Sequence, residues 1–156
     1  MDDQASQQHK NEQEMRDIIE EARCILPGLQ AVFGFQTIAV FNKRFTDLAT
    51  YAQVCHLVGL GLMVVAMAML MTPAVYNRAK RGQATSRMLR MSRKSIRGGL
   101  IPLAVGLSLD MLTVMSLATD MLSLSIAAAV ATLLLFMGLW YFIPRSDPAQ
   151  VAEPRS

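Results

Sequence analysis

Three polar side chains interrupt otherwise apolar stretches of this sequence, and their chemical types suit the handling of protons or small cations. Gln36, His56 and Asp110 each lie in a different stretch. A carboxyl group and an imidazole can exchange a proton near neutral pH, and an amide can orient them or offer an oxygen to a cation. We therefore take Gln36, His56 and Asp110 as candidates for proton or cation handling.

The depth predicted for the three side chains places them in the same outer half of a membrane. At about 1.5 Å per residue, Asp110 lies about 12 Å, Gln36 about 9 Å and His56 about 6 Å below the outer boundary. A charged carboxylate in hydrocarbon costs on the order of 3 kcal/mol or more, so Asp110 should face the interior of a bundle. Two interpretations stay open: a proton relay, or a neutral Asp110 whose hydrogen bond to a backbone carbonyl or to Gln36 only holds helices together.

The elements that must position these residues are four long stretches nearly free of charge. They match the roughly 20 residues that cross about 30 Å of hydrocarbon. Their distribution predicts an all-α, four-span transmembrane helical bundle, and the polar residues 2–23 lack the pattern of a cleaved secretory signal. The expected spans are residues 24–41, 52–71, 98–118 and 121–143.

Lysine and arginine lie almost entirely on one side of this topology. Thirteen fall before the first span, between the second and third spans, or after the fourth, and two fall in the remaining loops. By the positive-inside rule, both termini are cytoplasmic, including a C-terminal tail over residues 144–156. We expect a multi-pass protein of the plasma membrane, which is the inner membrane in a Gram-negative bacterium.

Residues 1–23 are predicted to form a cytoplasmic tail followed by an amphipathic helix that leads into the first span. Acidic residues outnumber basic ones in this segment, so it should dock on the basic loop between the second and third spans rather than on anionic lipid. Its apolar face is formed by Met15, Ile18, Ile19, Ala22, Ile25 and Leu26.

The basic loop carries its charge without interleaved aromatic residues, which disfavours a nucleic-acid surface. Its position beside two spans favours contact with lipid headgroups, and the bilayer is the partner we expect. The residues assigned to headgroup contact are Arg87, Arg90, Arg93, Lys94 and Arg97.

Small and polar residues mark faces where helices can pack closely. Since four helices enclose little space, a solute path would require a homo-oligomer, for which the small-residue face of the last span is the candidate contact. The residues predicted to pack helices are Gln30, Gly34, Gly106, Ala128 and Thr132.

The sequence carries none of the motifs of soluble enzymes, such as a phosphate-binding glycine loop, HExxH, CxxC or a serine elbow. We therefore expect no enzymatic activity, cofactor or metal site. Cys24 and Cys55 fall at opposite ends of the predicted bundle, so we expect small apolar fillers rather than a disulfide.

A series of short motifs covers most of residues 15–143: Glu20-Glu21-Ala22-Arg23, Leu26-Pro27-Gly28-Leu29-Gln30, Phe33-Gly34-Phe35-Gln36, Phe41 to Arg44-Phe45, His56-Leu57 and Thr72-Pro73-Ala74-Val75-Tyr76-Asn77-Arg78. Their order resembles a group of uncharacterised small four-helix bacterial integral membrane proteins, some of which are labelled sodium:proton antiporter-like. The resemblance implies a fold and a membrane location. The small multidrug transporters fit less well, because their essential glutamate in the first span has no counterpart between residues 24 and 41.

Two functional hypotheses follow. The first is a small channel or transporter for protons or monovalent cations. The alternative is a non-transporting accessory or scaffold protein that recruits a cytoplasmic partner, whose identity the sequence leaves open. The arrangement of Gln36, His56 and Asp110 around a water-accessible cavity would favour the first.

Overall fold

A computed structural model describes residues 2–79 and 85–142, and every regular element within these ranges is a helix. The all-helical prediction is thereby confirmed for the described part of the chain. In chain order the elements are α1 (Asp2–Val40), α2 (Lys43–Thr46), α3 (Thr50–Ala79), α4 (Ser86–Thr119), α5 (Leu122–Met137) and a π-helical turn, η1 (Gly138–Phe142).

Four described helices are long and apolar enough to cross a membrane, which supports the prediction of a membrane protein. They extend over Ser6–Val40, Thr50–Ala79, Ser86–Thr119 and Leu122–Tyr141. The 39 residues of α1 would extend about 58 Å, well beyond the roughly 30 Å of a hydrocarbon core. Part of α1 therefore belongs outside the apolar layer.

Two helices are longer than the sequence pattern predicts. Pro27 lies inside α1, and the segment before it forms one helix with the first span. Likewise α4 begins at Ser86 and continues through Gly98 and Gly99 into the third span. A Cβ atom on Gly99 would lie 3.2 Å from the Cβ of Met69, so close packing against α3 offsets the low helix propensity of glycine there.

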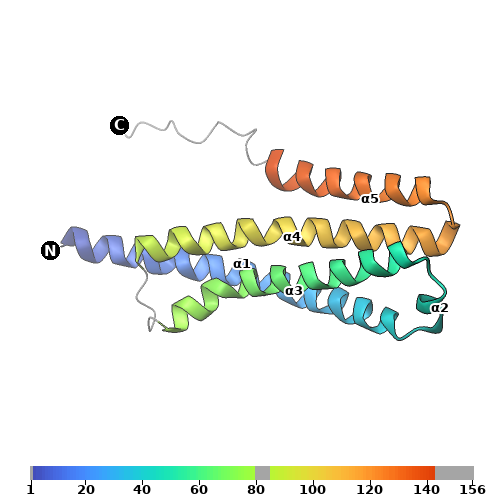
Figure 1. The fold of residues 1–156 in the computed structure, drawn as a ribbon. Helices are drawn as coiled ribbons and strands as arrows, with labels where there is room; N and C mark the ends of the chain where they lie inside the picture. The colour runs from blue at the N-terminus through green and yellow to red at the C-terminus, as the bar shows by residue number, and fades with distance from the viewer. Residues whose placement is uncertain (1, 80–84, 143–156) are drawn as a thin grey trace.

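The helices pack around α4, which lies between α5 on one side and α1 with α3 on the other (Figure 1). The α3–α4 contact is tight because two glycines face each other. A Cβ on Gly106 would lie 3.2 Å from the carbonyl oxygen of Gly59, and a Cβ on Gly59 would lie 3.2 Å from that of Gly106. At the end of the bundle near α2, Asp120 adopts a left-handed conformation (φ 53°) and turns the chain from α4 into α5.

Candidate functional site

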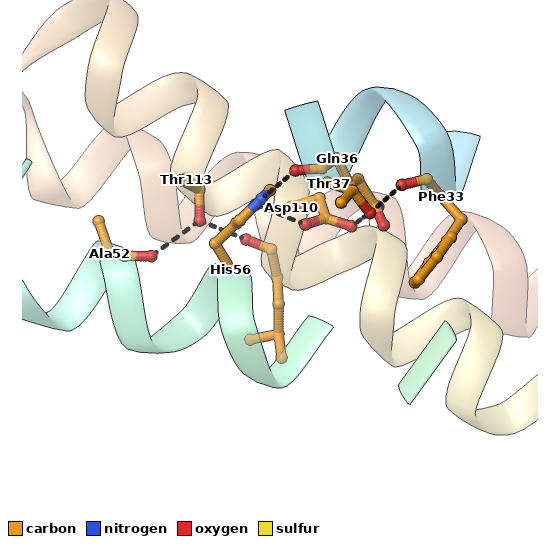
Figure 2. A network of polar contacts seen from close by, with 8 residues as sticks. Phe33, Gln36, Thr37, Ala52, His56, Asp110 and Thr113 are labelled. Carbon is orange, nitrogen blue, oxygen red and sulfur yellow. Dashed lines mark hydrogen bonds and ion pairs between the residues drawn. The ribbon is translucent and has the colours of Figure 1, made fainter. Parts of the chain in front are cut away.

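The structure brings the side chains of Gln36, His56 and Asp110 into direct contact at the junction of α1, α3 and α4 (Figure 2). The Gln36 amide donates a hydrogen bond from Nε2 to Oδ2 of Asp110. His56 places Nδ1 3.1 Å from Oδ1 of the same carboxyl group. All three residues are buried, with 8%, 5% and 9% of their surfaces exposed for Gln36, His56 and Asp110. We call these three residues the polar cluster.

The second ring nitrogen of His56 determines how protons are arranged in the polar cluster. Nε2 of His56 lies 3.0 Å from the backbone carbonyl oxygen of Gln36, and a carbonyl oxygen can only accept, so Nε2 carries a hydrogen. Nδ1 and Oδ1 of Asp110 must then share one proton, either on the carboxyl group or on the imidazole. Without that proton, two lone pairs would face each other in a buried site.

Gln36 leaves an acceptor unused beside this shared proton. Its Oε1 is buried and has no hydrogen-bond partner among the described residues. Buried polar atoms are nearly always partnered, so an unpaired carbonyl oxygen next to a carboxyl group is unusual. The polar cluster thus offers carboxyl and amide oxygens in one place, a combination that can accept a proton donor or coordinate a monovalent cation.

Two contact residues of the polar cluster escaped the sequence analysis. A Cβ on Gly59 would lie 3.1 Å from Oδ1 of Asp110, so glycine gives the carboxyl group room between α3 and α4. The ring of Phe45, on α2, meets the ring of His56 edge-on with centroids 5.4 Å apart. The spacing of Gly59 one turn after His56 indicates that the two residues share a face of α3. No sequence pattern indicates that α2 brings Phe45 against His56.

Further hydrogen bonds tie α3 to α4 one and two turns from Asp110. The Thr113 hydroxyl donates to the carbonyl oxygen of Ala52 on α3 at 3.2 Å and also to that of Leu109 on its own helix at 3.1 Å, and the former contact is visible in Figure 2. Beyond it, the hydroxyl groups of Tyr51 and Ser116 lie 3.0 Å apart. These bonds fix the position of Asp110 relative to His56.

The residues predicted to pack helices have mixed environments. Gly106 lies in the close α3–α4 contact, and Ala128 and Thr132 are half-buried on α5, where the Thr132 hydroxyl donates to the Ala128 carbonyl at 2.8 Å. A Cβ on Gly34 would meet no heavy atom within 4 Å, and Gln30 is exposed. Neither Gly34 nor Gln30 therefore sits in a tight helix contact within the described chain.

The five basic residues predicted to contact headgroups are all exposed along the first turns of α4. Arg93 forms an ion pair with Glu14 of α1, and the Ser92 hydroxyl lies 3.9 Å from the sulfur of Met15. The N-terminal part of α1 thus contacts the basic part of α4. A pocket of about 540 Å³ lies at this end, and none of the polar-cluster residues lines it.

Cysteine and metal chemistry have few candidate groups in the described ranges. Cys24 and Cys55 are free thiols. Within residues 2–79 and 85–142, no three His, Cys, Asp or Glu side chains come together as a metal site would require.

Residues 4–144 match the model of a family of unknown function, DUF6328, which covers most of the chain. No curated protein and no solved structure matches the sequence.

Proposed function

This protein belongs to DUF6328, a family of unknown function, and we propose that it conducts protons or monovalent cations across the membrane through the polar cluster. The observation that carries the proposal is the contact between Nδ1 of His56 and Oδ1 of Asp110, which are 3.1 Å apart and buried among three helices. A carboxyl–imidazole pair at membrane depth is a combination found in proton pathways.

The charge of the His56–Asp110 pair determines which ions it can bind. With its shared proton the His56–Asp110 pair is neutral, and loss of that proton leaves one negative charge in a buried site. That charge favours either a returning proton or a monovalent cation, which the Asp110 carboxylate and Oε1 of Gln36 would coordinate. Protons and cations would therefore compete for the same oxygens.

We also propose a topology and a location for the chain. Both termini lie in the cytoplasm, the membrane is the plasma membrane, and the protein is not an enzyme. The N-terminal part of α1 serves as the amphipathic cytoplasmic segment, since Met15, Ile18 and Ala22 are buried while Asp17 and Glu21 are exposed. This orientation places the basic start of α4 in the cytoplasm.

A homo-oligomer would complete the path, because one chain encloses little space. Ala127 and Ala131 lie four residues apart on the exposed side of α5, where a second copy can approach closely. Ala128 and Thr132, which were expected to serve this contact, are half-buried on α5 instead.

Flux measurement in reconstituted vesicles tests the transport proposal. Vesicles with a pH-sensitive dye inside would be challenged separately with a pH step and with Na⁺ or K⁺ gradients. Asp110→Asn keeps the size of the side chain but cannot exchange the proton, and we expect its flux to fall to that of protein-free vesicles. Ser108→Ala is the matched control, because Ser108 is buried on the same helix and donates only to the backbone carbonyl of Ala104, one turn earlier, at 2.7 Å. Unchanged flux in Asp110→Asn would exclude the polar cluster as the path.

A second candidate function, as an accessory or scaffold protein, is favoured by the part of α1 and α4 that extends beyond the apolar layer. Arg87, Arg90 and Lys94 are exposed there, and they would form the surface that recruits a cytoplasmic partner. A wild-type protein without flux above protein-free vesicles, under any pH or cation gradient, would favour this function.

A further inference from the structure

The pocket of about 540 Å³ lies between α1, α4 and the C-terminal end of the last span. Ile96, Leu100 and the ring of Trp140 give it an apolar wall, while Glu21 and Arg97 give it charge. The volume falls within the roughly 300–1,000 Å³ of small-molecule sites. An apolar wall beside charged groups is the chemistry of an amphipathic ligand.

The position of the pocket along the helices corresponds to a membrane interface. Arg97 is the last charged residue before the apolar stretch 98–109 of α4, so the hydrocarbon layer begins about one turn later. Trp140 and Tyr141 belong to the residue types that gather at the headgroup level. The Tyr141 hydroxyl donates to the backbone carbonyl oxygen of Arg97 at 3.3 Å, which joins the end of the last span to this part of α4.

The charges in the pocket are not equally available. Arg93 also lines the pocket, but it is paired with Glu14. Arg97 and Glu21 have no ion-pair partner among the described residues. The pocket therefore presents one available cation and one available anion beside an apolar wall.

We infer that this pocket binds a single phospholipid with an ethanolamine headgroup, independently of the proposed function. The Arg97 guanidinium pairs with the lipid phosphate, the Glu21 carboxylate accepts from the primary ammonium, and an acyl chain follows Leu100 and Trp140. A lipid with a net negative headgroup would leave Glu21 facing further negative charge. A choline headgroup offers no N–H donor to Glu21.

The single tryptophan of the sequence, Trp140, reports on this pocket directly. The full-length protein would be reconstituted in phosphatidylcholine vesicles that contain a small fraction of lipid with brominated acyl chains. Bromine quenches tryptophan fluorescence only on contact, so the dependence on lipid fraction gives a relative affinity. We expect brominated phosphatidylethanolamine to quench Trp140 at a lower fraction than brominated phosphatidylcholine or phosphatidylglycerol.

Two variants separate the roles of the charges. In Arg97→Gln, we expect the affinity for the ethanolamine lipid to fall roughly fivefold, the effect of one basic residue on a lipid headgroup. In Glu21→Gln, the preference for ethanolamine over the glycerol headgroup should disappear while the phosphate contact persists. Lys94→Gln and Glu20→Gln are matched controls, because both residues are exposed neighbours that do not line the pocket.

Equal quenching by all three lipids, preference of the wild type for phosphatidylglycerol, or equal effects of lining and control variants would each overturn the inference. If Arg97→Gln fails to fold, the loss of headgroup preference in Glu21→Gln still tests whether the pocket recognises the ethanolamine headgroup. Vesicle flux is a separate measurement, so failure of the transport proposal leaves this result unaffected.

Discussion

The two ends of the bundle each pair an acidic with a basic side chain, but in different surroundings. Near α2, His56 and Asp110 are buried, with 7% and 12% of their side chains exposed, and Gln36 adds a hydrogen bond from a third helix. At the other end, Arg93 and Glu14 are 60% and 34% exposed at the side chain. Water can replace a lost partner only at the exposed pair. Breaking the buried pair should therefore lower the free energy of unfolding more than breaking the exposed pair.

This difference suggests a division of roles. The buried His56–Asp110 pair lies beside an amide oxygen that has no partner among the described residues, so loss of its proton would leave a buried negative charge, which is costly. The Glu14–Arg93 pair joins the N-terminal part of α1 to the start of α4 at an exposed surface. It positions the wall of the lipid pocket without burying charge.

The largest effect is expected from breaking the buried pair. His56→Leu leaves Asp110 without its main partner, and the free energy of unfolding should fall by about 3 kcal/mol. The double variant His56→Leu/Asp110→Leu removes both polar groups and should recover much of this loss. Equilibrium unfolding in mixed micelles measures both quantities. A double variant less stable than His56→Leu would mean that the Asp110 carboxyl group stabilises the fold without His56.

The next effect comes from the space that Gly59 provides. Gly59→Ala would place a methyl group 3.1 Å from Oδ1 of Asp110 and 3.2 Å from the Gly106 carbonyl oxygen. Such overpacking costs about 1–3 kcal/mol, and it should also reduce flux if the polar cluster conducts. Gly61→Ala is the control on the same helix, because its new Cβ meets no heavy atom within 4 Å. Equal stability of the two alanine variants in the same unfolding assay would contradict the close contact.

A smaller effect is expected at the edge of the polar cluster. Phe45→Ala removes the ring that meets His56 at 5.4 Å, an aromatic contact worth about 0.5–1.5 kcal/mol. It should also expose the His56 ring to diethyl pyrocarbonate, which acylates accessible imidazoles. Phe41→Ala is the control, since Phe41 is 84% exposed. Mass spectrometry of the modified protein would show whether His56 reacts faster only in Phe45→Ala.

The features that the sequence predicts well are those that the hydrocarbon layer imposes. Four long uncharged stretches have few alternatives to spanning helices, and an intramembrane Asp110 has to face protein. The predicted depths of Gln36, His56 and Asp110 fall in one layer, and the structure places their side chains in contact. Their role in proton or cation handling stays a prediction.

The features that escaped prediction depend on how the helices rotate and approach one another. Hydropathy does not determine which face of the first span is exposed, so Gln30 was expected in a helix contact although it lies on the exposed side of α1. The spacing of Gly59 one turn after His56 places both residues on one face of α3, but this spacing alone does not show that Asp110 of another helix lies against Gly59. The continuity of α1 through Pro27 shows that one lost hydrogen bond does not end a long helix.

The smallest effect is expected at the exposed pair, and it completes the comparison between the two ends. A double-mutant cycle with Glu14→Gln and Arg93→Gln should give a coupling free energy of about 0.2–1 kcal/mol, well below that of His56 and Asp110. Since both side chains are partly exposed, added salt should weaken the coupling, whereas the buried pair should respond little. Unfolding of the four proteins at low and high ionic strength measures this difference. A salt-independent coupling as large as that of the buried pair would mean that α1 and α4 shield these charges from water more completely than their exposed surfaces indicate.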